Sequence, residues 1–335
     1  MIRYAVIGTS WITDAFIEGA AQSTPELVLS AVYSRTCEKG MTFAARHGIS
    51  TVYTSLQQLA QASDIDAVYI ASPNIMHYPQ ARMMLSAGKH VLCEKTCVVT
   101  SAQLEDLLGI AADRGAVFME AIKILHMPEL KTVEEALPRL GRVHLCKFDF
   151  SRYSSKYPQY LAGQTPNIFK PELAAGALMD MGIYSVYPAV WLFGEPLRVQ
   201  AHAVLLRTGA DGAGGVLLDY DDNVVSITYS KMSESRQWCT IQGDQGVLAI
   251  DTIEHMDCVD FIDCRGVREP LLRRDTARKP MGFEANDFYR WITDPAGCAE
   301  ESARVTDTTR AVIRTMERIR ASAGIRLPAL PESMD

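Results

Sequence analysis

The sequence predicts an α/β protein: an N-terminal Rossmann dinucleotide-binding domain followed by a C-terminal α+β domain with a large open, mostly antiparallel sheet. Three observations predict it. Apolar strands alternate with helices up to about residue 120, a strand–turn–helix–strand unit opens the chain, and hairpin signals fill residues 197–263. A chain of 335 residues is long enough for about two domains. We place the Rossmann domain at residues 1–120 and a substrate-binding and oligomerisation domain at residues 121–335.

Apolar runs in the N-terminal part are predicted to be buried parallel strands, because helical segments separate them. Glycines stand where three of these helices should end, as C-terminal glycines do. The expected strands are Tyr4–Ile7, Val28–Tyr33, Ala67–Ala71, His90–Cys93 and Val117–Met119, and the helices between them include Lys39–His47, Ser55–Ala60, Met76–Ala87 and Ser101–Arg114.

The C-terminal part has a different pattern. A strand is expected at Arg142–Phe150, then a polar loop rich in aromatic residues, then a helix from about Glu172 to Phe193. From Leu197 to Asp263 only strand and tight-turn signals occur, which predicts one mostly antiparallel sheet built from hairpins. Two amphipathic helices, Gly282–Thr293 and Ala303–Ala321, are expected to close the chain.

The turn after the first strand is a candidate pyrophosphate site, because a helix N-terminus offers unpaired N–H groups and partial positive charge. A full fingerprint has three glycines, but here only the first is glycine, and Ser10 and Thr13 take the other two positions. Small residues still permit close approach, although an ordinary buried strand followed by a helix is the alternative. The candidate cofactor-binding residues of this turn are Gly8, Thr9, Ser10, Trp11 and Ile12.

The second strand ends without the carboxylate that would bind the ribose 2′-hydroxyl of NAD. Arg35 follows it instead and is suited to a 2′-phosphate, with Ser34 and Thr36 as further hydrogen-bond donors. This pattern favours NADP and leaves NAD possible. A solvated arginine at a helix start is the alternative interpretation.

Two further strand ends carry polar residues. The candidate cofactor contacts after the strand at Ala67–Ala71 are Ser72, Pro73, Asn74 and His77. The alternative for Asn74 is that it caps the next helix, and the alternative for His77 is that it lies on a helix surface. The next strand ends in Glu94 and Lys95, both also candidates. A lysine beside a cleft is unusual, because burying an ammonium group is costly without a partner.

These motifs together resemble the glucose–fructose oxidoreductase / inositol dehydrogenase (Gfo/Idh/MocA) family over nearly the whole chain. Glu94-Lys95-Thr96 stands where that family typically has Glu-Lys-Pro, and Ala71–His77 matches its Ala-Ser-Pro-Asn-x-x-His stretch. Ala175–Tyr184 resembles its Gly-Gly-x-Leu-x-Asp-x-Gly-x-His element. Tyr184 in the last position resembles the branch containing glucose–fructose oxidoreductase and the dimeric trans-dihydrodiol dehydrogenases.

The resemblance implies hydride transfer between a nicotinamide cofactor and a sugar, polyol or related hydroxy or carbonyl compound. Tyr184 would donate or accept the proton. Lys95 would lower its pKa from about 10 and bond the substrate oxygen. Asp180, four residues before Tyr184 and so expected on the same helix face, would bind a substrate hydroxyl or orient Lys95. An aspartate that caps a helix or forms a salt bridge elsewhere is the alternative interpretation. Lys123 and Asn167 are further candidate substrate-binding residues. A catalytically silent NAD(P)-sensing regulator of the same fold is the alternative.

Composition and charge limit the kinds of partner that the protein is expected to bind. A net charge of −7 argues against nucleic acid, and no apolar run approaches the ~20 residues of a membrane span. The eight cysteines form no CxxC pair, so no metal site is expected. We expect reduced thiols, no secretory signal and a cytoplasmic location. We also expect a homodimer or dimer of dimers through the C-terminal sheet.

Overall fold

The computed structural model describes residues 1–327, which form two compact units. The first unit combines Met1–His126 with Arg278–Thr306, and the second combines Met127–Ala277 with the described residues from Asp307 onward. The sequence-based boundary lies between residues 120 and 121, whereas the first unit also takes in a segment from late in the chain. Residues 328–335 of the expected second domain lie outside the described residues.

The first unit contains a six-stranded parallel sheet in the order β3-β2-β1-β4-β5-β6, which is the order of a dinucleotide-binding fold. Its central strands are buried because helices cover both faces of such a sheet. The predicted Rossmann domain is therefore confirmed, although the three-residue edge strand β3 was not predicted. The strands are β1 (Ile2–Ile7), β2 (Leu27–Tyr33), β3 (Thr51–Tyr53), β4 (Ala67–Ile70), β5 (His90–Glu94) and β6 (Phe118–Ala121).

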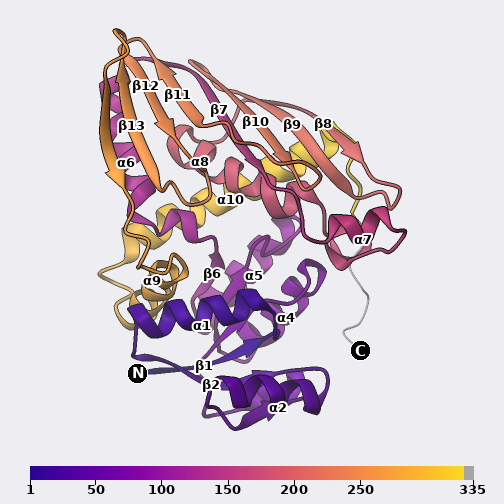
Figure 1. The fold of residues 1–335 in the computed structure, drawn as a ribbon. Coiled ribbons are helices and arrows are strands. Elements are labelled where there is room, and N and C mark those ends of the chain that lie inside the picture. The colour runs from indigo at the N-terminus through magenta and orange to yellow at the C-terminus, as the bar shows by residue number, and fades with distance from the viewer. Residues whose placement is uncertain (328–335) are drawn as a thin grey trace. The chain divides into compact units, whose positions relative to one another are not determined.

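A helix from late in the chain completes the first unit. α9 packs against α1 (Figure 1). The contact is close because both helices present glycine: a Cβ on Gly19 would lie 2.7 Å from the Gly282 nitrogen. The helices of this unit are α1 (Trp11–Ser23), α2 (Cys37–Arg46), α3 (Leu56–Gln61), α4 (Asn74–Ser86), α5 (Ser101–Arg114), the short η1 (Lys123–Leu125) and α9 (Met281–Thr293).

The second unit is built on an eight-stranded sheet in the order β14-β13-β12-β11-β7-β10-β9-β8. Within the described part of this sheet only the β7–β10 pair is parallel, so the predicted open, mostly antiparallel sheet is confirmed. The strands are β7 (Val143–Ser151), β8 (Arg198–Leu205), β9 (Asp211–Asp219), β10 (Val224–Ser230), β11 (Cys239–Gly243), β12 (Gly246–Ile250), β13 (Cys258–Asp263) and β14 (Arg268–Arg273).

Helices lie on one face of this sheet (Figure 1). Alternation along β10 explains which face they cover, since Val225, Ile227 and Tyr229 are buried while Thr228 is exposed. The helical elements are α6 (Pro128–Ala136), η2 (Leu137–Leu140), α7 (Tyr157–Leu161), η3 (Asn167–Phe169), η4 (Pro171–Leu173), η5 (Leu178–Gly182), α8 (Ile183–Phe193) and α10 (Ala299–Ala323), of which α10 begins in the first unit.

The expected continuous helix from Glu172 to Phe193 is wrong. The 3₁₀ turn η4 ends at Leu173. Ala174 follows with a left-handed backbone (φ 53°), and Gly176 has φ 153°. The chain then makes the π-helical turn η5 before the α-helix α8. The irregularity matters for the site because η5 contains Asp180, and π turns occur frequently at functional sites.

The same stretch is long and apolar enough, by length and composition alone, to cross a membrane. An 18-residue window within Pro171–Phe193 has a mean hydropathy of 1.2. However, 78% of the most apolar window is buried inside the protein, which is typical of a core helix of a folded domain.

Candidate functional site

The turn between β1 and α1 is shaped for close approach of a phosphate. Gly8 has φ +116°, and a Cβ there would lie 2.5 Å from the Ala71 carbonyl oxygen at the end of β4. Only glycine is accommodated at this point. Thr9 and Ser10 complete the turn; Ser10 is the N-cap of α1, its side chain makes no capping bond, and Trp11 and Ile12 begin the helix. Because the first N–H groups of a helix have no intrahelical acceptor, the turn fits a pyrophosphate.

The region after β2 fits the other end of a dinucleotide. Ser34 is buried, and its backbone N–H donates to the Tyr53 carbonyl at 3.0 Å, which fixes the start of the loop. Arg35 and Thr36 are exposed at the N-terminus of the ten-residue helix α2, and the Thr36 side chain does not cap that helix. A guanidinium group, a hydroxyl and a helix N-terminus together suit a phosphate monoester.

His77 joins two loops at the carboxyl edge of the parallel sheet. Its ring is buried, with Nδ1 2.9 Å from the Thr96 carbonyl and Nε2 2.7 Å from the Ser72 carbonyl. Burial lowers the pKa of His77, while both carbonyls oppose this shift. Pro73 takes the N-cap position of α4 and Asn74 its first residue. The alternative of a surface histidine does not hold.

The Glu94 carboxylate faces the interior of the first unit. Its Oε1 accepts a hydrogen bond from the Tyr69 hydroxyl at 2.6 Å, and its Oε2 accepts from the Lys95 N–H at 3.3 Å. The following peptide bond, Lys95–Thr96, is cis. The buried Glu94 carboxylate therefore links the end of β5 to Tyr69 of β4 and to the backbone N–H of Lys95.

Helix α9 adds acidic groups that the sequence analysis missed. Glu284 is fully buried and neither of its carboxylate oxygens has a hydrogen-bond partner among the described residues. Burial raises the pKa of Glu284 well above its ordinary value of 4.5; the Glu94 and Asp287 carboxylates raise it further, and the ammonium group of Lys123 opposes them. Asp287 is 2.9 Å from Nδ1 of the buried His126. Residues so distant in sequence gave no signal of this proximity.

In the second unit, Asp180 and Tyr184 occupy successive elements, η5 and α8. The Tyr184 ring contacts Phe150 of β7 edge-to-face, with ring centroids 5.4 Å apart. Asp180 forms a hydrogen-bonded ion pair with Lys231, which follows β10 and was not predicted. Asn167 is exposed at the start of η3.

Asp211, at the start of β9, holds the beginning of the helical stretch that contains Asp180. Its Oδ2 accepts a hydrogen bond from the Leu178 N–H at 2.6 Å. Burial raises the pKa of Asp211 to about 6, while that hydrogen bond and the charge of Lys231 lower it. A Cβ on Gly176 would lie 2.0 Å from Asp211 Oδ1, so glycine is required there for the carboxylate to fit.

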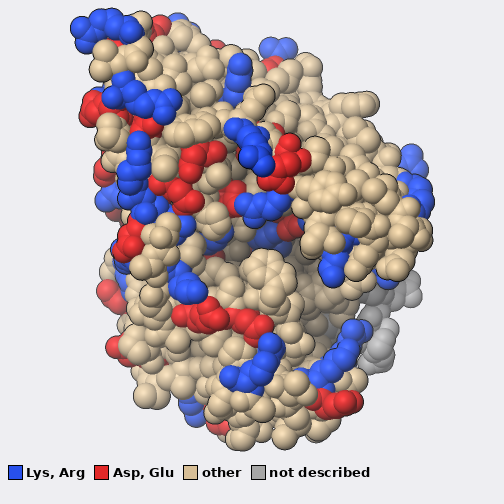
Figure 2. Space-filling view, viewed as in Figure 1, with Lys and Arg blue, Asp and Glu red and all other residues tan. Residues whose placement is uncertain are grey.

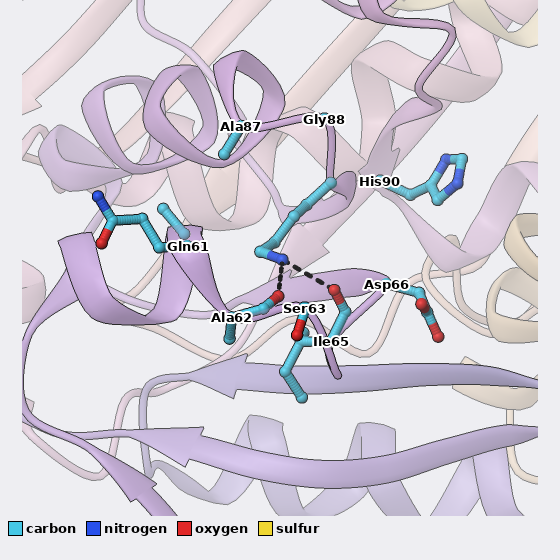
Figure 3. A pocket seen from close by; sticks show the side chains of 10 residues that line it. Gln61, Ala62, Ser63, Ile65, Asp66, Ala87, Gly88 and His90 are labelled. Atoms are coloured by element: carbon cyan, nitrogen blue, oxygen red, sulfur yellow. Dashed lines mark hydrogen bonds between the residues drawn. The ribbon is translucent and has the colours of Figure 1, made fainter.

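A pocket of about 510 Å³ lies at the opposite edge of the parallel sheet, beside the amino ends of β4 and β5 (Figure 3). Lys89 lines it and donates to the carbonyl oxygens of Ala62 and Ile65 at 2.7 and 2.8 Å. These bonds satisfy backbone carbonyls in the loop between α3 and β4, which is a structural role. Because ligands of such sheets bind at the carboxyl ends of the strands, this pocket is not the cofactor site.

Two further features of the described residues are their potential metal ligands and their surface charge. Residues 1–327 contain no group of three or more His, Cys, Asp or Glu side chains placed to hold a metal ion, and all eight cysteines are free thiols. On the face shown in Figure 2, acidic and basic side chains are interspersed.

A parallel sheet in this order, with a glycine turn and a helix N-terminus at its carboxyl edge, is the architecture of a dinucleotide-binding domain. Comparison with known families agrees: residues 2–122 match the oxidoreductase family with an NAD-binding Rossmann fold, and residues 136–249 match the GFO/IDH/MocA C-terminal domain. The chain belongs to the Gfo/Idh/MocA family of NAD(P)-dependent oxidoreductases.

Individual relatives extend over nearly the whole chain. The scyllo-inositol 2-dehydrogenase (NADP(+)) IolU of Bacillus subtilis (strain 168) is 40% identical over 98% of this chain and 99% of its own. A trans-1,2-dihydrobenzene-1,2-diol dehydrogenase of Oryctolagus cuniculus is 27% identical, covering 84% and 81%. The fold matches the crystal structure of KijD10, a 3-ketoreductase from Actinomadura kijaniata in complex with NADP and TDP-benzene, with a TM-score of 0.83, 23% identity and coverage of 96% and 98%.

Proposed function

We propose that this enzyme uses NADP to oxidise or reduce a sugar, a cyclic polyol or a related hydroxy or carbonyl compound. The observation that carries the cofactor assignment is the exposed Arg35 at the N-terminus of α2, where NAD-specific sites place a carboxylate. The whole-length relative named as an NADP(+)-dependent scyllo-inositol 2-dehydrogenase supports the choice of cofactor and of a polyol. When bound, the nicotinamide supplies the acceptor or donor of hydride.

The chain's own residues would hold the cofactor at the carboxyl edge of the first sheet. The Gly8–Ile12 turn would receive the pyrophosphate, and Ser34, Arg35 and Thr36 the 2′-phosphate. Ser72, Pro73, Asn74, Glu94 and Lys95 border the same edge. We expect His77 to act through the loops it joins, because both its nitrogens face backbone carbonyls.

The proton chemistry is proposed for Tyr184 and Lys95, with Asp180 as a substrate contact. Tyr184 would donate or accept the substrate proton, and the ammonium group of Lys95 would lower the tyrosine pKa and bond the same oxygen. Asp180 would accept a hydrogen bond from a substrate hydroxyl, with Lys123 and Asn167 as further substrate contacts. The ion pair of Asp180 with Lys231 supports an ionised carboxylate in this role.

The first experiment compares NADPH and NADH binding by fluorescence or calorimetric titration, with Arg35→Glu alongside the unaltered enzyme. We expect tight NADPH binding, much weaker NADH binding, and loss of the preference in the variant. Equal affinities for both cofactors would contradict the assignment to NADP. Binding without turnover in a screen of inositols, sugars and dicarbonyls would favour the alternative of an NAD(P)-sensing regulator.

The second experiment replaces Lys95 by methionine, which keeps the length of the side chain and removes its charge. We expect turnover to be abolished while NADPH still binds, because the ammonium group acts on the reacting oxygen. Normal turnover in Lys95→Met would remove this lysine from the mechanism. Lys156→Met, at an exposed position just before α7, is the matched control.

We further propose a cytoplasmic enzyme that forms a homodimer, or a dimer of dimers, through the sheet of the second unit. Free cysteines support the first part of this proposal. Exposed apolar side chains on β8 and β9 support the second.

A further inference from the structure

Lys231 is a nearly buried cation whose partner is a candidate substrate-binding residue. It follows β10, and only 6% of its side chain is exposed, against 41% for that of Asp180. Its Nζ donates a hydrogen bond to Asp180 Oδ2. Removing an ammonium group from water is costly unless a partner neutralises it. The buried Lys231 ammonium group therefore favours staying paired with the Asp180 carboxylate.

Two backbone hydrogen bonds hold the main chain of Lys231 in place, so its side chain starts from a fixed position. Its N–H donates to the Gly212 carbonyl at 2.9 Å, and its carbonyl accepts from the Ser154 N–H at 3.0 Å. The Lys231 charge also acts on Asp211, which holds the Leu178 N–H two residues before Asp180. One cation thus interacts with Asp211, which binds the start of this helical stretch from β9, and with Asp180 inside the stretch.

We propose that Lys231 is a positioning residue that keeps Asp180 ionised and fixes its rotamer, so that the carboxylate is presented ready to accept a substrate hydroxyl. This inference rests on the proposed function for the role of Asp180. Lys231 itself would touch neither substrate nor cofactor. Its contribution is preorganisation: a carboxylate on a π-helical turn is held in one place before substrate arrives.

The direct test measures the carboxyl pKa of Asp180 by NMR of aspartate labelled with ¹³C at the carboxyl carbon, in protein without substrate, with Asp180→Asn providing the assignment. In Lys231→Met we expect the Asp180 pKa to rise by about one to three pH units, because a nearby cation is lost. Lys231→Arg should restore most of the original value. An unchanged pKa in Lys231→Met would overturn the inference whatever the enzyme's substrate.

The kinetic test is a double-mutant cycle with the substrate that the screen identifies. Lys231→Met should lower kcat/KM about 10- to 100-fold, mainly through KM, and leave NADPH affinity unchanged. In the Asp180→Asn background the same substitution should cost little, because the proposed effect of Lys231 on substrate binding acts through the Asp180 carboxylate. Equal losses in both backgrounds would overturn the inference.

The matched control is Lys147→Met, which makes the same change at an exposed position of β7, the strand paired with β10. It should leave both the Asp180 pKa and the kinetics unchanged. If Asp180→Asn alone retains full activity, the role of Asp180 in the proposed function fails, while the NMR result still decides whether Lys231 sets the state of that carboxylate.

Discussion

At the scale of single residues, buried acids in the first unit differ in how they are satisfied. Glu94 accepts from the Tyr69 hydroxyl, and Glu120 Oε1 accepts from the Cys97 N–H at 2.7 Å. Glu284 is equally buried, yet its two oxygens have no partner in the described part of the chain. An ionised carboxylate without hydrogen bonds is unfavourable in an apolar interior, so the acid form of Glu284 is favoured in the folded enzyme.

This difference predicts that the effect of Glu284 on the free energy of unfolding depends on pH. The folded-state pKa lies above the ordinary value of 4.5, so the unfolded chain releases its proton first as pH rises. The contribution to stability is present below about pH 4.5 and is lost as pH rises toward the folded-state pKa. In Glu284→Gln the thermal midpoint should therefore gain on the unaltered enzyme as pH increases from about 4.5 to 8. Parallel curves would contradict this, and Glu38→Gln, exposed on α2, is the control.

Tyr184 carries the second prediction at this scale. Tyr184→Phe keeps the ring that packs edge-to-face on Phe150 and removes only the hydroxyl, so the fold should be retained. The rate should fall by about 10²–10⁴, the usual contribution of a general acid–base group. A loss below threefold in kcat would mean that another residue handles the proton. Tyr153→Phe, at an exposed position in the same unit, should have no effect.

At the scale of elements, the sequence predicted what local pattern determines and missed what depends on distant contacts. The glycine turn at Gly8 and the helix start at Arg35 were predicted because strand, turn and helix signals follow one another along the chain. The break before η5 was missed because apolar periodicity continues through Gly176, where the Asp211 carboxylate of β9 leaves no room for a Cβ. Lys231 was missed for the same reason: its pairing with Asp180 joins residues 51 positions apart.

The β1–α1 turn allows a direct test at this scale. In Gly8→Ala a Cβ would meet the Ala71 carbonyl at 2.5 Å, and alanine is also strained at φ +116°. A strain of about 1–3 kcal/mol, of the size found at such positions, should shift the turn and weaken NADPH binding at least about tenfold. Gly109→Ala is the matched control, since a Cβ there meets nothing within 4 Å and alanine favours the helix. Equal NADPH affinity in both variants would show that the turn does not contact the cofactor.

At the scale of the whole molecule, the eight-stranded sheet leaves apolar side chains on its outer face. Along β9, Val216 and Leu218 are buried while Leu217 is 42% exposed, and Val204 of β8 is 52% exposed. Val204 pairs with Ala213 and Leu217 with Gln200, so Leu217 and Val204 lie on the same face of the sheet. This outward apolar surface, beside the polar Ser226 and Thr228 of β10, is the contact we assign to a second copy.

Leu217→Arg tests that assignment. The side chain is exposed within one chain, so its replacement should leave folding and NADPH binding intact while placing two like charges across a two-fold contact. By sedimentation, the unaltered protein should have at least about twice the 37.0 kDa mass of one chain, and Leu217→Arg should approach the single-chain mass. Leu161→Arg, 63% exposed on α7 and outside the sheet, should assemble normally. Unaltered protein that sediments as a single chain would contradict the assembly, and a Leu217→Arg variant that still dimerises would place the interface on another surface.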